Sequence, residues 1–160
     1  MTDVLIVGAG PAGLTAAIYA RRAGLTAQLL EQLLPGGQMG TTPEIRNYPG
    51  FPEIDGMALS EEMKRHALNE GAQIVSGTVT GLEIEESSLF RVRAGGEVYE
   101  GRTLILATGA IRRKLDVPGE EQLAGAGVSY CAVCDGNFFK GREVAVVGGG
   151  NTALDRKSVV

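Results

Sequence analysis

Val4-Leu-Ile-Val-Gly-Ala-Gly-Pro-Ala-Gly13 is the stretch that decides the predicted fold. An apolar run over Thr2–Val7 leads into it, and residues 11–24 have the alanine, leucine and isoleucine content of a helix that packs on a sheet. A second apolar run follows at Ala27–Glu31, so the three segments predict a β-α-β unit. The glycine spacing between strand and helix is that of a dinucleotide-binding fingerprint.

Each glycine of this fingerprint has its own expected role. Gly8 makes the turn, Gly10 leaves room for a pyrophosphate and Gly13 lets the helix approach the strand, while the helix N-terminus faces the phosphates. Glu31 ends the second run, 18 residues after Gly13, where a carboxylate can accept hydrogen bonds from a ribose. We therefore expect a dinucleotide site, with a purely structural glycine-rich turn as the alternative.

Composition places the chain among globular proteins. Apolar residues make up 44% and charged residues 21%, which excludes disorder, collagen and coiled coil. Glycine accounts for 24 of the 160 residues, well above the usual share of about 7%, and favours binding by backbone groups. The net charge of −4, without any basic run, argues against nucleic acid as a partner.

The sequence also predicts a compartment. Its longest apolar stretches are too short to cross a membrane, and Asp3 stands where a signal peptide would need cations. We expect a cytoplasmic protein with no membrane partner. The two cysteines are too few for a disulfide scaffold.

Turn and cap residues organise the middle of the chain. Residues 32–57 hold four of the six prolines and form a long irregular stretch, which is typical of a functional loop. Ser60 is the expected N-cap of a helix that runs to about residue 70 and ends at Gly71. His66 lies in that helix, and we expect a surface residue and no metal site because the sequence has no second histidine.

Alternation of apolar and polar residues then predicts strands at 73–75, 79–84, 89–94 and 97–100, with Gly95-Gly96 as a hairpin turn. We expect these strands to form a small antiparallel layer over the main parallel sheet. Two further buried strands are predicted, at 103–108 and 143–147.

The fingerprint occurs twice. Val144-Ala-Val-Val-Gly-Gly-Gly-Asn-Thr-Ala153 superposes without a gap on residues 4–13, 140 positions earlier. The repeat predicts the start of a second nucleotide-binding unit.

Cys131-Ala-Val-Cys134 is a second chemical motif. In a reducing compartment this spacing indicates either half of a zinc site or a redox pair, and redox is favoured because no second ligand pair is present. A helix starting at the motif would stabilise a thiolate. Asp135 could exchange a proton with the departing thiolate, or it is a plain acidic residue in a first helical turn.

Several motifs in order resemble one family, the low-molecular-weight bacterial thioredoxin reductases. They are Gly8 to Gly13, Gly36-Gly37-Gln38 with the residues from Glu31 onward, Asn47-Tyr-Pro-Gly-Phe-Pro52, Ala107-Thr-Gly109, Cys131-Ala-Val-Cys-Asp-Gly136 and Gly148-Gly-Gly-Asn-Thr-Ala153. The resemblance covers residues 2 to about 154. It implies an FAD enzyme of the pyridine-nucleotide disulfide oxidoreductase type, with a Rossmann-like FAD domain and a second Rossmann-like domain for NADPH.

The resemblance also implies roles for single residues. Those matching the family's flavin contacts are Gly8, Gly10, Pro11, Ala12, Gly13, Glu31, Gln32, Gly36, Gly37, Gln38, Asn47, Val79, Thr108 and Gly109. Those matching the start of the NADPH turn are Gly148, Gly150, Asn151, Thr152 and Ala153. Cys134 would face the flavin, and Cys131 would attack the disulfide of the partner.

The family's chain is about twice as long, and this difference shapes the expected domains. We expect part of the FAD domain at 1–115 and the start of the NADPH domain, with the redox pair, at 116–154. Residues 155–160 depart from the family and equal the translation of a common sequencing-adapter string, so we expect a non-native tail.

The function implied for the parent protein is that of an NADPH-dependent thioredoxin-disulfide reductase. Electrons would pass from NADPH to FAD, then to the Cys131 and Cys134 disulfide, and finally to thioredoxin, in a protein that is a homodimer. One alternative is a related flavin dithiol reductase that serves a peroxidase. Another is that the 160 residues alone form an inactive flavin-binding fragment.

Overall fold

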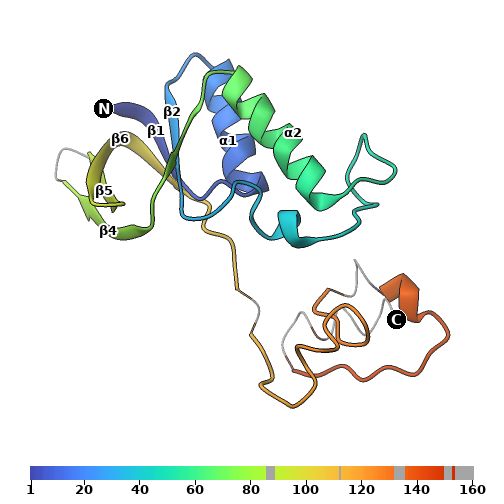
Figure 1. Ribbon diagram of the computed structural model, residues 1–160. Coiled ribbons are helices and arrows are strands. Elements are labelled where there is room, and N and C mark those ends of the chain that lie inside the picture. Colours follow the sequence, from blue (N-terminus) through green and yellow to red (C-terminus); the bar gives the residue numbers. More distant parts are fainter. Residues whose placement is uncertain (86–88, 112, 132–135, 150–152, 154–160) are drawn as a thin grey trace. The chain divides into compact units, whose positions relative to one another are not determined.

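The computed structural model describes residues 1–85, 89–111, 113–131, 136–149 and 153. The chain divides into two compact units, residues 1–110 and residues 111–160 (Figure 1). Each unit is described by itself. Among the described residues, no helix combines the length and the apolar character that a membrane crossing requires.

The first unit begins with the predicted β-α-β arrangement. Strand β1 (Thr2–Val7) and strand β2 (Ala27–Glu31) pair in parallel from Val4↔Ala27 to Val7↔Leu30, and helix α1 (Pro11–Arg22) connects them. At the start of the two strands, the Asp3 carboxylate accepts hydrogen bonds from the backbone N–H and the hydroxyl of Thr26, at 2.9 and 2.6 Å. The hydrogen bond from the Thr26 hydroxyl is the main reason why the pKa of Asp3 is lowered.

The predicted start of the second helix is wrong. A short 3₁₀ helix, η1 (Gly37–Thr41), lies in the long loop, and helix α2 runs over Gly56–Asn69. Its N-cap is Asp55, whose carboxylate accepts a hydrogen bond from the backbone N–H of Ala58 at 3.0 Å. Ser60 lies inside the helix and is buried, with its hydroxyl donating to the Gly56 carbonyl at 2.7 Å. Asp55 caps the helix because its carboxylate accepts from a free N–H of the first turn. Ser60 lies beyond that turn, where the backbone N–H groups already have partners within the helix.

The six strands form one sheet in the order β3-β2-β1-β6-β5-β4. Its remaining strands are β3 (Gln73–Ser76), β4 (Val79–Ile84), β5 (Phe90–Ala94) and β6 (Glu97–Leu106). Strand β3 pairs in parallel with β2, which corrects its predicted place among the antiparallel strands. The Gly95-Gly96 hairpin is confirmed, since Ala94 pairs with Glu97 and both glycines have positive φ, as a two-residue primed turn requires.

The segments predicted as strands at 97–100 and 103–108 are one continuous strand. The first half of β6 pairs antiparallel with β5, and from Gly101 onward the strand pairs in parallel with β1. Gly101 is buried, and a Cβ there would lie 2.7 Å from the Cβ of Leu5. The absence of a side chain at this point therefore lets one strand pass from one layer to the other.

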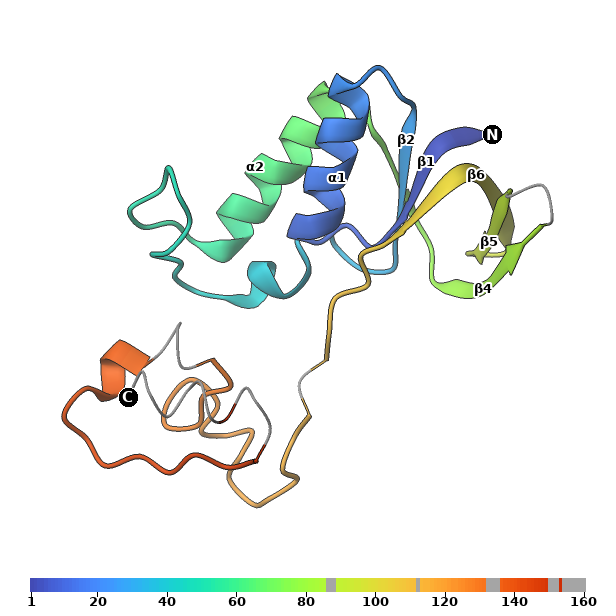
Figure 2. The ribbon, with the colours of Figure 1, turned by 180° about the vertical axis from the view of Figure 1, so that it is seen from behind.

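Two apolar cores lie on the two faces of the parallel strands. On one face, helices α1 and α2 lie beside the parallel strands (Figure 2). There Leu14 and Ile18 of α1 and Leu59 and Met63 of α2 pack on Ile6 and its neighbours. On the other face, Val92 and Ala94 of the antiparallel strands pack on residues 5, 7 and 30. The predicted α/β fold, a parallel sheet with a small antiparallel layer, is thus confirmed.

In the second unit, a 3₁₀ helix, η2 (Gly136–Phe139), follows the cysteine motif. The strand predicted at 143–147 is wrong: these residues have no assigned secondary structure, and Val144, Val146 and Val147 are exposed. A strand is stabilised by hydrogen bonds to a neighbour, and the described part of this unit contains no strand to supply them.

Candidate functional site

The glycine turn lies at the carboxyl end of β1, against the carboxyl end of β6. Gly8 has φ +100°, and a Cβ there would lie 2.3 Å from the carbonyl oxygen of Ala107. A Cβ on Gly13 would lie 2.0 Å from the carbonyl oxygen of Gly8. Contacts this short are forbidden to real side chains, so the fold itself requires both glycines.

Gly10 differs from the other two. Its φ of −72° suits any residue, and the nearest atom to a Cβ there would be the Cα of Gly37, at 3.9 Å. Gly10 is also the N-cap of α1, with Pro11 as the first helical residue, no capping side chain and no acidic residue in the first turn. The fold therefore does not require a glycine here, while the helix start presents backbone N–H groups that no side chain of its own first turn caps.

Glu31 is bound to the turn itself. Its carboxylate accepts hydrogen bonds from the backbone N–H groups of Ala9 and Leu33, at 2.6 and 3.0 Å. The backbone joins the same strand ends, since Gly8 N–H donates to the Leu30 carbonyl and Gly36 N–H to the Ala9 carbonyl, both at 2.8 Å. The carboxylate thus ties the end of β2 to the glycine turn.

Two further predicted segments complete a cradle around the start of α1. Gly37 approaches Gly10, and the side-chain amide of Gln38 donates to the Ala110 carbonyl. Thr108 and Gly109 are exposed just beyond β6. The structure therefore brings the glycine turn, Glu31, residues 36–38 and residues 107–110 together, at the carboxyl ends of parallel strands where α/β folds bind ligands.

Three predicted flavin contacts lie outside these hydrogen bonds. Gln32 is exposed, and Asn47 is exposed in the loop before the Tyr48–Phe51 bridge. Val79 opens β4 and packs against the second core. Their roles stay predictions from the resemblance.

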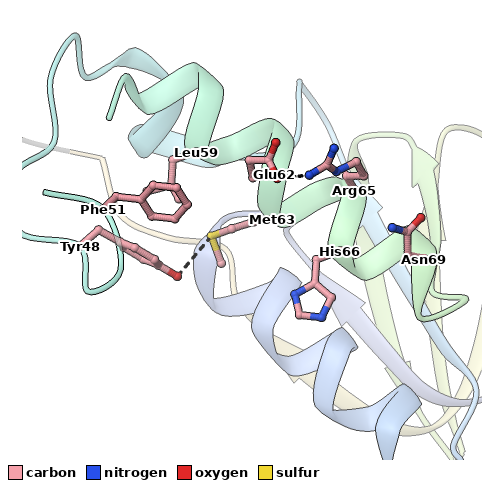
Figure 3. Close-up of a pocket in the computed structure, with 8 residues that line it drawn as sticks. All are labelled: Tyr48, Phe51, Leu59, Glu62, Met63, Arg65, His66 and Asn69. Carbon is pink, nitrogen blue, oxygen red and sulfur yellow. Dashed lines mark hydrogen bonds and ion pairs between the residues drawn. The ribbon is translucent and has the colours of Figure 1, made fainter. Parts of the chain in front are cut away.

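A separate pocket of about 380 Å³ lies along α2 (Figure 3). Tyr48 and Phe51 line it opposite Met63, and the Tyr48 hydroxyl contacts the Met63 sulfur at 3.9 Å. Glu62 pairs with Arg65, and His66 lies 3.7 Å from Glu70. None of the predicted site residues that the structure describes lines this pocket. The described residues contain no group of three metal-ligating side chains, here or elsewhere.

The cysteine motif lies in the second unit. Cys131 is disulfide-bonded, and the Ser129 hydroxyl accepts from its backbone N–H at 3.1 Å and donates to its carbonyl at 3.3 Å. Cys134 and Asp135 lie outside the described residues, as do Gly150, Asn151, Thr152 and the tail at 155–160. Gly148, with φ +119°, and Ala153 line a hollow of about 860 Å³ within the same unit.

One buried carboxylate in this unit escaped sequence reasoning. Glu120 is only 3% exposed and accepts hydrogen bonds from the backbone N–H groups of Leu115 and Asp116 and from the Tyr130 hydroxyl. The Tyr130 bond is the main cause that lowers the pKa of Glu120. Glu121, its exposed neighbour, pairs with Lys114. Nothing in the sequence distinguishes the two adjacent glutamates.

Comparison with known proteins supports the resemblance. The family model for pyridine nucleotide-disulphide oxidoreductases matches residues 2–158. The chain is 49% identical to the thioredoxin reductase of Bacillus subtilis over 154 residues, which are 96% of this chain and 48% of that protein. It is 44% identical to the bifunctional thioredoxin reductase/thioredoxin of Mycobacterium leprae, of which it covers 34%. The chain therefore spans about half the length, or less, of these curated relatives.

Solved structures of thioredoxin reductases are also similar to this chain. The thioredoxin reductase of Streptococcus pyogenes superposes with a TM-score of 0.87 at 45% identity, over 98% of this chain and 51% of that one. The thioredoxin reductase from Giardia duodenalis superposes with a TM-score of 0.89 at 39% identity, over the same shares. These matches confirm the Rossmann-like fold, and the enzymes of this kind use FAD and NADPH.

Proposed function

Because the chain belongs to the pyridine nucleotide-disulphide oxidoreductase family, we propose that it holds FAD on the cradle around α1 and exchanges electrons with a protein disulfide through Cys131 and Cys134. On this proposal thioredoxin is the protein partner, as the names of the relatives suggest, and NADPH is the electron donor, in keeping with a pyridine-nucleotide family. The reaction fits a reducing cytoplasm, and we expect the parent protein to be a homodimer.

The contrast among the three glycines carries the proposal. Gly8 and Gly13 are required by contacts within the chain, whereas Gly10 has an ordinary φ and a free approach. A glycine that the fold does not need, at the start of a helix with no capping side chain, fits a pyrophosphate that comes close to the backbone.

The other walls of the cradle suit the rest of the dinucleotide. The Glu31 carboxylate uses two backbone donors and keeps lone pairs that can accept from ribose hydroxyls. Residues 36–38 and 107–110 lie next to the turn, and the glycines at 36, 37 and 109 leave room for a flat ring system. When bound, FAD supplies a two-electron carrier between a nicotinamide and a disulfide.

The cysteines would perform the exchange with the partner. With the pair reduced, the Cys131 thiolate attacks one sulfur of the partner disulfide, and the other sulfur leaves as a thiolate. Cys134 then attacks the mixed disulfide, which restores the intramolecular bond and releases the partner as a dithiol. Asp135 would supply or accept the proton that each thiolate needs.

The test compares Gly10→Ala with the wild-type chain in a titration with FAD, followed by flavin fluorescence. We expect the substitution to weaken binding at least about tenfold because the methyl group occupies the pyrophosphate's place, and to change stability by less than about 1 kcal/mol. Thr15→Val, on the exposed side of α1, is the matched control and should bind as the wild type does. Equal affinity of the Gly10 variant and wild type would refute the assignment of the cradle.

A further inference from the structure

Glu120 organises the segment that leads into Cys131. The carboxylate accepts from the backbone N–H of Leu115 at 3.0 Å to each oxygen, from Asp116 at 2.7 Å and from the Tyr130 hydroxyl. Asp116 has φ +58°, a conformation that costs energy for residues other than glycine. Aspartate adopts this region more readily than most residues, and here the buried Glu120 carboxylate supports it by accepting from the Asp116 N–H.

The same carboxylate reaches the redox motif through one residue. Tyr130 is half-buried and directly precedes Cys131, so its bond to Glu120 connects the 115–120 turn to the backbone of the cysteine. Two backbone bonds restrain the chain just before it: Val128 N–H donates to the Leu123 carbonyl at 2.8 Å, and Gly125 N–H to the Val128 carbonyl at 2.9 Å. Of the groups in these hydrogen bonds, only the Glu120 carboxylate is both charged and buried.

We propose that Glu120 is a positioning residue which, through the Tyr130 hydroxyl, holds Cys131 in the geometry of its disulfide and so sets the redox equilibrium of the pair. This inference rests on the proposed function. Cys131 is disulfide-bonded in the structure, so the Glu120–Tyr130 contact is seen with the oxidised form. On this proposal that contact is more favourable in the oxidised form than in the dithiol. Loss of the tether should therefore make the disulfide easier to reduce.

The experiment equilibrates the 160-residue chain with reduced and oxidised glutathione. In the reaction, the protein disulfide and two glutathione thiols yield the protein dithiol and one glutathione disulfide. Tyr130→Phe removes only the hydroxyl, and Glu120→Gln presents an amide donor where all the present partners are donors. We expect each variant to shift the equilibrium toward the dithiol by about threefold to tenfold, and the double variant to shift it no further than the larger single effect. Glu121→Gln changes the exposed neighbour of Glu120 and is the matched control; it should leave the glutathione equilibrium unchanged.

This readout separates positioning from simple stability. A merely structural role would destabilise oxidised and reduced forms alike and leave the glutathione equilibrium unchanged, so a wild-type equilibrium in Tyr130→Phe overturns the proposal. If Glu120→Gln fails to fold, Tyr130→Phe still decides. A wild-type chain that shows no reversible two-electron exchange would refute the proposed function, and this inference with it, whereas normal exchange with unshifted variants would refute the inference alone.

Discussion

The backbone N–H of Ala9 donates to the carboxylate of Glu31 at 2.6 Å, so the acid at the end of β2 holds the middle of the glycine turn. A second oxygen of the same carboxylate accepts from Leu33. Glu31 therefore shapes the turn and, on the proposed function, also contacts the ribose of the ligand.

Glu31→Ala should consequently weaken both the fold and the ligand site. Loss of a charged acceptor leaves the Ala9 N–H without its partner and should cost about 1–3 kcal/mol of unfolding free energy. FAD affinity should fall further than stability alone explains, measured by titration under conditions where both proteins are folded. Gln28→Ala is the control: it removes a half-buried side chain of the same strand whose hydrogen bond goes to Gln73 and not to the turn. Unchanged denaturation midpoints would show that the carboxylate does not support the turn.

Gly8→Ala and Gly13→Ala should destabilise the chain by at least about 2 kcal/mol each, because the new methyl groups meet carbonyl oxygens. Gly24→Ala separates this clash from backbone strain, since Gly24 also has positive φ, +80°, but no atom within 4 Å of a Cβ. Chemical denaturation measures all three. If Gly24→Ala cost as much as Gly8→Ala, the short contact with Ala107 would not be the cause.

Cys131→Ser should abolish thiol-disulfide exchange, since serine cannot form the mixed disulfide. FAD affinity should stay unchanged, because the substitution alters none of the cradle residues. Exchange is followed with a thioredoxin disulfide as the oxidant of the reduced chain. Undiminished exchange in the variant would contradict the redox role, and one equivalent of bound zinc in the wild type would support the rival metal site.

Acid should loosen the region around Glu120. The pKa of this carboxyl is lowered in the folded chain, first by the Tyr130 hydroxyl and then by the Leu115 N–H. Its contribution to stability is therefore complete above the ordinary carboxyl range and is lost as the pH falls through the lowered pKa. Limited proteolysis of the second unit should accelerate on acidification, and Glu120→Gln should flatten that dependence. A pH profile in Glu120→Gln equal to that of wild type would assign the acid sensitivity to other groups.

Asp55→Ala should cost about 1 kcal/mol, the usual value for an N-cap. Ser60→Ala should cost less, because its hydroxyl donates to a carbonyl within the helix that already has a helical partner. Comparison of the two denaturation midpoints tests which residue begins α2. A larger loss from Ser60→Ala would restore the serine as the important group.

The sequence was sufficient to predict those parts of the fold that depend on residues close together in the chain. The β1-turn-α1-β2 unit and the Gly95-Gly96 hairpin were predictable because glycine spacing and apolar periodicity specify them within short windows. The predicted N-cap, Ser60, is instead buried inside α2, and Asp55 caps the helix one turn earlier.

The remaining differences arise from long-range partners. Two strands were predicted in place of β6 because Gly101 and Arg102 interrupt the apolar pattern. Pairing with β5 and then with β1 keeps the strand continuous. Residues 143–147 have the composition of a buried strand but no partner strand among the described residues of their unit. Glu120 and Glu121 differ only in what folds around them.

Because β6 is continuous, the register of the β5–β6 hairpin fixes which residues of β6 reach the proposed FAD cradle. A two-residue turn closes β5 and β6 within microseconds in isolated hairpins, whereas pairing of Thr2 with Gly101 must first close a loop of almost the whole unit. The pairing register set at Gly95-Gly96 therefore also fixes the position of the end of β6, where Ala107 contacts Gly8. One residue inserted between the hairpin and Gly101 would turn every later side chain of β6 to the opposite face, so an error near a surface turn would be transmitted to the wall of the proposed FAD cradle.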